Sequence, residues 1–178
     1  MGTGPETSIT ETIRESSGRR RTFFIAFLSA MAIFFAIAET AVPKPLPWMR
    51  LGLANAITLY AFSTMRLKDV LVIVVARVVT ASLLIGTFLS ISFILSLTGA
   101  LASFGVMCFF YSIFKRWISL VGISVLGAVT SNATQLFVVN TLFVNSRLSY
   151  YFLPFLFLFA LAGGTISGLF GRFLVKNI

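Results

Sequence analysis

The sequence predicts an all-α integral membrane protein, a compact bundle of six transmembrane helices with both termini on the cytoplasmic side. Two features of the composition point to this fold class, because 58% of the 178 residues are hydrophobic and 11% are charged. A soluble domain usually carries about 25% charged residues. A third observation is that the charged residues fall between apolar runs, most of them long enough to cross a bilayer.

The chain begins with a polar stretch that is rich in Ser, Thr, Glu and Gly and has no apolar period. This composition predicts a disordered, basic cytoplasmic tail over residues 1–21, followed by one transmembrane domain over residues 22–178. The first expected span is Phe23–Val42, with about 20 residues. The alternative is a cleaved secretory signal, because small residues precede Glu39 as they precede a signal cleavage site. A mature N-terminus at Glu39 would identify such a signal.

Five further apolar segments complete the predicted bundle. Short polar or charged breaks separate them, except that the third and fourth are divided by a tight turn at Gly86. The second follows a proline-rich turn and is the shortest. The expected spans are Leu51–Met65, Val70–Gly86, Thr87–Phe114, Ile118–Val144 and Tyr150–Val175.

The basic residues of the loops predict the orientation in the membrane. With a cytoplasmic N-terminus, ten of them lie in inside segments and three in outside segments, which obeys the positive-inside rule. The same pattern accounts for the net charge of +9 by contact with anionic lipid, so no nucleic acid partner is expected. The inside set is Arg14, Arg19, Arg20, Arg21, Arg66, Lys68, Lys115, Arg116, Arg172 and Lys176, and the outside set is Lys44, Arg50 and Arg147.

Polar residues within the apolar runs are the candidates for function, because burying them in hydrocarbon is unfavourable unless they are hydrogen-bonded. Arg77 lies near the middle of the third span, and Glu39 is its expected ion-pair partner. Asn55 and Thr58 share one face of the second span. The residues alone leave two interpretations open, a ligand site or a structural network that orients the helices. The fifth span adds Ser131, Asn132, Gln135 and Asn140.

Small residues repeat at four-residue spacing along three of the expected spans, which lets helices approach closely. Such repeats serve either packing within the chain or docking of a partner. The first span carries Ala26, Ala30, Ala32 and Ala36, the fifth carries Gly127 and Ser131, and the sixth carries Gly164, Ser167, Gly168 and Gly171.

The residues that are missing argue against catalysis by this chain. The sequence has no histidine, a single aspartate and no Gly-rich phosphate loop. These absences exclude a Ser/His/Asp triad, an Asp-rich magnesium site and nucleotide binding of the P-loop type. We therefore expect no enzyme activity, no metal and no cofactor.

Two stretches carry a more specific signal. One runs from Glu39-Thr40-Ala41-Val42-Pro43 to Met49–Leu59, and the other is Gly122–Ala128 continuing into Ser131–Gln135, with Arg77 between them. Over about residues 22–176 the chain resembles the Gx transporter family, which is also described as heptaprenyl diphosphate synthase component I. Members are similar to the substrate-binding S-components of energy-coupling factor (ECF) transporters. Ser131 stands where a histidine is common in the family, and Arg50 stands where a lysine is common.

The resemblance implies a membrane-embedded binding subunit in the bacterial cytoplasmic (inner) membrane. A small vitamin-like or cofactor-precursor molecule would bind in a cavity near the outer face, closed by Pro43–Arg50. A partner ATPase module would drive uptake through a transmembrane coupling subunit that docks on the first helix. The substrate-binding candidates are Glu39, Trp48, Arg50, Asn55, Arg77, Asn132 and Gln135, and the partner-docking candidates are Ala26, Ala30, Ala32 and Ala36.

Two other classes of function stay open at this point. The family description indicates an accessory membrane subunit of polyprenyl diphosphate synthesis, which would need a separate catalytic partner. A membrane subunit of a flavin or quinone redox system would use the polar residues for packing alone. Trp48 is similarly open, since it would either stack on an aromatic ligand or anchor the chain at the membrane interface.

Overall fold

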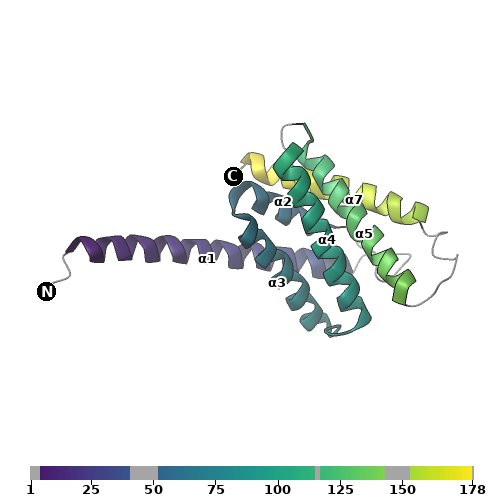
Figure 1. Cartoon of the computed structure of the whole chain (residues 1–178), viewed down its shortest axis with the longest axis horizontal. Helices are drawn as coiled ribbons and strands as arrows, with labels where there is room; N and C mark the ends of the chain where they lie inside the picture. Colours follow the sequence, from purple (N-terminus) through teal and green to yellow (C-terminus); the bar gives the residue numbers. More distant parts are fainter. Residues whose placement is uncertain (1–4, 41–51, 115–116, 143–152, 178) are drawn as a thin grey trace.

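The computed structural model describes residues 5–40, 52–114, 117–142 and 153–177, and within these ranges the protein is all-helical. The six helices agree in number and order with the six predicted apolar segments (Figure 1). They are α1 (Pro5–Thr40), α2 (Asn55–Thr64), α3 (Leu67–Ile85), α4 (Ile91–Phe114), α5 (Leu120–Leu142) and α7 (Leu153–Asn177).

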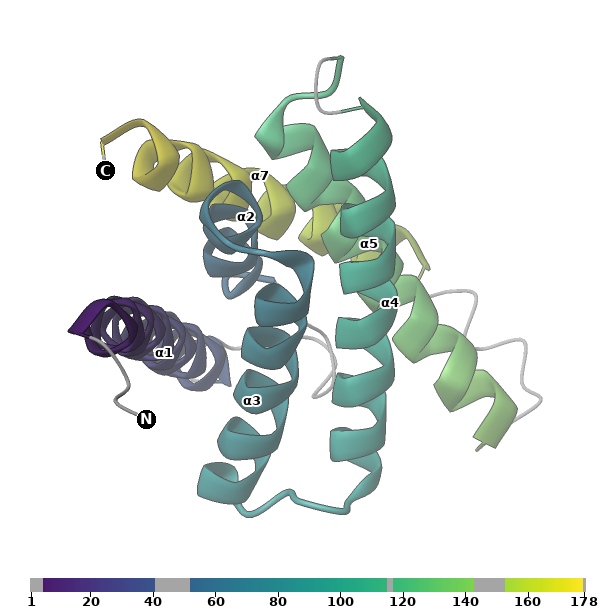
Figure 2. The same ribbon diagram turned by 60° about the vertical axis from the view of Figure 1, so that its left-hand side comes forward.

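The helices other than α2 are arranged in an arc, and α2 packs on the inner side of this arc. Along the arc, α1 packs on α3, α3 on α4, α4 on α5, and α5 on α7, while α2 contacts α1, α3, α5 and α7. Figure 2 shows α3 and α4 side by side as an antiparallel hairpin, with the short α2 lying between α3 and α7. The N-terminal part of α1 projects beyond the other helices (Figure 1).

α2 is the centre of the core. Its residues from Asn55 to Phe62 are all buried, so it is surrounded by protein on every side. Phe62 stacks on Phe104 and on Tyr111 of α4, with ring centroids 5.6 and 5.4 Å apart. With 10 residues it is about 15 Å long, half of the hydrocarbon thickness of a bilayer. The segment expected over Leu51–Met65 therefore forms a buried half-length helix, because Gly52 turns the chain and the helix begins only at Asn55.

Four of the helices in the described ranges are long and apolar enough to cross a membrane. The remaining long helix, α3, has 19 residues and carries Lys68, Asp69 and Arg77. The structure thus confirms an all-helical protein with helices that could span a membrane, whereas six full spans and their orientation stay predictions. The four segments are Gly18–Thr40, Ile91–Phe114, Leu120–Thr141 and Pro154–Lys176.

The N-terminal region lies in the same helix as the first expected span. α1 begins at Pro5 and continues without interruption to Thr40, so most of the 1–21 segment is helical. Proline fits the first turn of a helix, where its missing N–H has no partner to lose. The next glycine is Gly18, and the span that follows it extends the same helix.

α1 is tied to the start of α3 by an ion pair. The guanidinium of Arg21 donates to both carboxylate oxygens of Asp69, with Nε–Oδ2 at 3.0 Å. This hydrogen bond holds the pKa of Asp69 below its usual value. Asp69 also lies in the first turn of α3, where a negative charge is favourable. Both effects favour an ionised Asp69 at neutral pH.

Glycines on α7 allow the closest helix contacts. A Cβ on Gly164 would lie 2.7 Å from the Cα of Val125, and one on Gly168 would lie 2.5 Å from the Cα of Val121. Both distances are shorter than a real Cβ contact allows, so α5 and α7 touch through their backbones. These small residues therefore serve packing within the chain.

Candidate functional site

Five of the seven predicted substrate-binding residues lie in the described ranges, and Trp48 and Arg50 lie outside them. All five are buried, with at most 6% of each residue exposed. In so apolar a chain, a buried acid, a buried arginine and three buried amides form an unusual concentration of polar groups. The five are Glu39, Asn55, Arg77, Asn132 and Gln135.

Gly52 connects three of the helices through its backbone. Its N–H donates to Oε1 of Glu39 at the end of α1 (3.0 Å). Its carbonyl oxygen accepts hydrogen bonds from Oγ of Ser167 on α7 (2.7 Å) and from the N–H of Asn55 at the start of α2 (2.8 Å). We call Glu39, Gly52, Asn55 and Ser167 the Gly52 hub. It joins α1, α2 and α7 at one point.

The hub requires a glycine at position 52. Its φ of +80° lies in the left-handed region that other residues rarely adopt. A Cβ there would lie 3.0 Å from Nδ2 of Asn55 and 3.6 Å from the Cβ of Ala128 on α5. The turn also places the Glu39 carboxylate beside the N-terminal end of α2, where the helix dipole favours a negative charge.

One face of α5 continues the polar region beyond the hub. Gln135 and Ser131 are buried on this face, and Nε2 of Gln135 donates to Oγ of Ser131 (3.4 Å). Both pack against Gly99 of α4, since a Cβ on Gly99 would lie 2.8 Å from Nε2 of Gln135. The Cβ of Ala128, one turn before Ser131, would lie 3.6 Å from a Cβ built on Gly52. The α5 face therefore lies close to the Gly52 hub.

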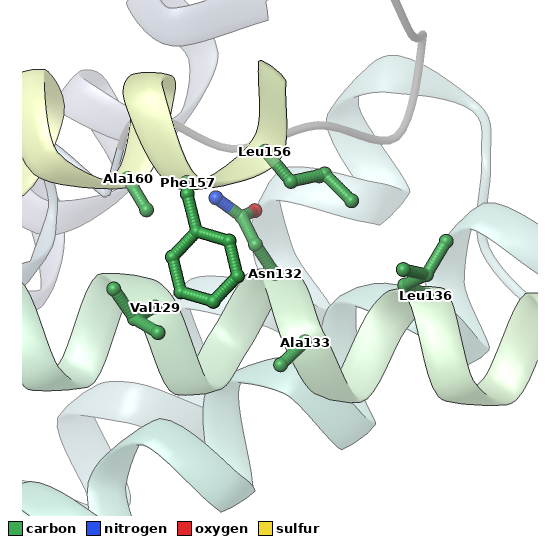
Figure 3. Close-up of a pocket in the computed structure, with 7 residues that line it drawn as sticks. All are labelled: Val129, Asn132, Ala133, Leu136, Leu156, Phe157 and Ala160. Carbon is green, nitrogen blue, oxygen red and sulfur yellow. The ribbon is translucent and has the colours of Figure 1, made fainter. Parts of the chain in front are cut away.

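Asn132 faces the other neighbour of α5. Figure 3 shows its side chain extending from α5 toward α7, beside the ring of Phe157. It is the polar member of a pocket of about 270 Å³ between these helices, part of which is open to the surroundings. The amide is buried although the pocket is otherwise apolar. The pocket is lined by Val129, Asn132, Ala133, Leu136, Leu156, Phe157 and Ala160.

The structure thus groups the predicted residues in three places. Glu39 and Asn55 meet through Gly52, Asn132 and Gln135 lie on α5 facing different helices, and Arg77 lies on the buried face of α3. The expected pairing of Arg77 with Glu39 stays a prediction.

The predicted docking alanines divide between two faces of α1. Ala26 and Ala30 are exposed, whereas Ala32 is fully buried and Ala36 is half-buried. Ala32 belongs to the same core cluster as Leu28 and the residues of α2. The surface that is accessible to a partner therefore contains Ala26 and Ala30, and Ala32 is used within the chain.

Gly52, Ser167 and Gly99 complete the site, although the sequence analysis did not select them as site residues. For Gly52 a signal existed, because a glycine between a proline-rich turn and a helix start is a common site of positive φ. Ser167 lies 115 residues from its partner Gly52, and no local pattern indicates that contact. Gly99 is one glycine within a long apolar helix, and its sequence context does not identify it as a site residue.

Comparison with known families supports the resemblance found in the sequence. The family model described as heptaprenyl diphosphate synthase component I matches residues 28–174. This range includes the whole Gly52 hub, the polar face of α5 and Arg77. No curated protein and no solved structure gave a match.

Proposed function

Because the chain belongs to the heptaprenyl diphosphate synthase component I family, we propose that it is the substrate-binding subunit of a membrane uptake system. The proposed substrate is a small vitamin-like or cofactor-precursor molecule, and a partner ATPase module energises its passage. The four long apolar helices agree with a multi-pass membrane protein of this kind. The proposed location is the bacterial cytoplasmic membrane.

The Gly52 hub is the observation that carries this proposal. Glu39 ends α1 and Gly52 precedes α2, so their hydrogen bond brings together both ends of the segment that contains Trp48 and Arg50. Gly52 lies close to the polar face of α5, on the side of Ala128. We infer that this segment, which lies outside the described residues, acts as a lid over the ligand.

Each polar residue then has a role suited to its chemistry. Arg50 attracts an anionic group of the substrate, and Trp48 stacks on a ring. Asn55 and Gln135 supply amide donors and acceptors, which fix the orientation of a ligand in an otherwise apolar site. Glu39 holds the hub in place and Arg77 balances its charge.

Binding by purified protein tests the proposal. Native mass spectrometry from mild detergent, followed by extraction of the bound small molecule, identifies the ligand. We expect Asn55→Ala to weaken binding roughly tenfold, the effect of losing one hydrogen bond of about 1.4 kcal/mol. Asn140→Ala is the matched control, because Asn140 is a half-buried amide near the end of α5, outside the polar contacts described here. Unchanged affinity in Asn55→Ala and in Arg50→Ala would contradict the proposed site.

The family description favours a second candidate, an accessory membrane subunit of polyprenyl diphosphate synthesis. In that case the protein assists a soluble catalytic subunit and the buried polar groups act in packing. Prenyltransferase activity of a soluble partner that rises on adding this protein would support the second candidate. If the protein bound no small molecule and the prenyltransferase activity rose, this second candidate would replace the proposed substrate-binding subunit.

A further inference from the structure

The turn between α3 and α4 has an unusually apolar surface for a loop. We call residues Gly86–Ser90 the hairpin tip, which is the lower end of the α3–α4 pair in Figure 2. Within the tip, Leu89 is 77% exposed and Phe88 is 41% exposed. Leu84, in the last turn of α3, is 68% exposed. In water, such a cluster of exposed large apolar side chains would be unfavourable.

No charge lies near the tip in the sequence. From Val78 to Phe114, a range that covers the end of α3, the tip and all of α4, there is no Asp, Glu, Lys or Arg. The charged residues of this hairpin begin at its other end, with Arg66, Lys68 and Asp69. The charged end of the hairpin therefore suits water, and the uncharged tip suits an apolar environment.

Several backbone groups of the tip are paired within the chain. The N–H groups of Gly86 and Thr87 donate to the carbonyls of Leu83 and Ser82, which closes the end of α3. The N–H and the hydroxyl of Ser90 both donate to the carbonyl of Thr87. Backbone groups that are paired within the chain are what a non-aqueous environment requires.

The length of α3 places the tip at the far edge of the hydrocarbon layer. Its 19 residues are about 28 Å long, close to the hydrocarbon thickness of about 30 Å. If the charged start of α3 lies at one membrane surface, its end therefore reaches only the opposite hydrocarbon boundary. The tip has no further residues with which to extend into water before α4 returns.

We propose that the hairpin tip is a lipid-inserted surface, with Leu84, Phe88 and Leu89 in contact with the hydrocarbon of bilayer lipids. The tip then anchors the α3–α4 hairpin at the membrane surface opposite its charged base. Leu89 has a φ of +62°, an uncommon conformation for a residue with a side chain, and it is more exposed than Phe88, the other large apolar residue of the tip. The proposal is independent of the substrate and of the partner module.

Spin-label accessibility in lipid vesicles tests this proposal. The only cysteine, Cys108, is replaced by alanine, and single cysteines at Leu89, Leu84, Lys68 or Leu101 carry a nitroxide. Lys68 is exposed at the charged base and is the water reference, whereas Leu101 is exposed on α4 and is the lipid reference. The protein is reconstituted alone in phosphatidylcholine and phosphatidylglycerol vesicles. Collisions with a water-soluble nickel chelate and with oxygen, which prefers lipid, are then measured.

We expect the label at position 89 to collide with the nickel chelate several-fold less often than the label at position 68. Its oxygen collisions should match those at position 101, and position 84 should repeat the result. Nickel accessibility equal to that at position 68 would overturn the proposal. Low accessibility to both reagents would also overturn it, because the tip would then be covered by protein, for example a second copy of the chain.

Discussion

α1 and α2 meet at the Gly52 hub, yet they are held in opposite ways. In α2, residues Asn55 to Phe62 are all buried, whereas only 17% of the most apolar window of α1 is buried. α2 is fixed by packing on every side. α1 is held by one packed face around Leu28 and Ala32 and by polar ties, the Arg21–Asp69 pair and the Glu39–Gly52 bond.

Displacing α1 and displacing α2 would cost different amounts of packing. In a bilayer, lipid tails solvate exposed apolar side chains as well as other helices do, so burial of Phe23 or Phe34 gives no driving force for packing α1 against the bundle. Displacing α2 would break packing on four helices, but displacing α1 breaks mainly its contacts with α3 and a few hydrogen bonds. α1 is therefore the helix whose displacement would lose less packing than displacement of α2.

The largest expected effect comes from a cavity in α2. Leu59 is fully buried, so Leu59→Ala should lower the free energy of unfolding by about 2–5 kcal/mol through lost packing. Phe34→Ala is the matched change in α1, where the side chain is 68% exposed, and its effect should be within about 0.5 kcal/mol. Thermal unfolding in one detergent, followed by circular dichroism, measures both. Equal losses of unfolding free energy in the two variants would show that α1 and α2 do not differ in how they are held.

Gly52→Ala tests the hydrogen-bonded turn that links α1 to α2 at the Gly52 hub. The left-handed backbone alone should destabilise the variant by about 1–2 kcal/mol. Gly86 provides a control with almost the same φ, +77° against +80°, but with no atom within 4 Å of an added Cβ. Gly52→Ala should therefore lower the unfolding temperature more than Gly86→Ala, because its Cβ also meets Asn55. Similar temperatures for the two variants would show that the Gly52 contacts are unimportant.

The turn at Gly52 is a part of the fold that could not be predicted from the hydropathy of the sequence. The long helices α4, α5 and α7 were predicted within a few residues, because charged or polar breaks bound each apolar run. The second segment was predicted as a span from Leu51, yet α2 begins at Asn55, since hydropathy does not register a turn made by one glycine.

The buried polar residues of the candidate site could be predicted from the sequence, but their contacts could not. Polar residues in apolar runs are visible in the sequence, so Glu39, Asn55, Asn132 and Gln135 were selected, and all are buried. Their partners depend on which helices become neighbours. The contact of Ser167 with Gly52 spans 115 residues and exists only because α7 packs beside α2.

Ser167→Ala should have a smaller effect than either change above. It removes the hydroxyl whose single proton is shared between the carbonyls of Gly52 and of Gly163 in α7, both at 2.7 Å, a loss of about 0.5–1.5 kcal/mol. Thr165→Ala is the control, since the Thr165 hydroxyl is exposed and bonds only within α7, to the carbonyl of Leu161. Hydrogen exchange should show faster opening at the start of α2 in Ser167→Ala than in Thr165→Ala. Unchanged exchange there would exclude Ser167 as a tie between α7 and α2.

The smallest expected effect is at the other end of α1, in the Arg21–Asp69 pair. The Arg21 side chain is 48% exposed, so solvent and salt screen its attraction to Asp69. A double-mutant cycle with Arg21→Ala and Asp69→Asn should give a coupling below the effect of Ser167→Ala. Arg21 lowers the pKa of Asp69 in the folded protein, so the contribution is present above the unfolded pKa of about 4 and is lost as the pH falls through the lower folded value. A coupling that stays constant from neutral pH to well below pH 4, measured at about 0.1 M salt, would show that the ion pair does not hold α1 to α3.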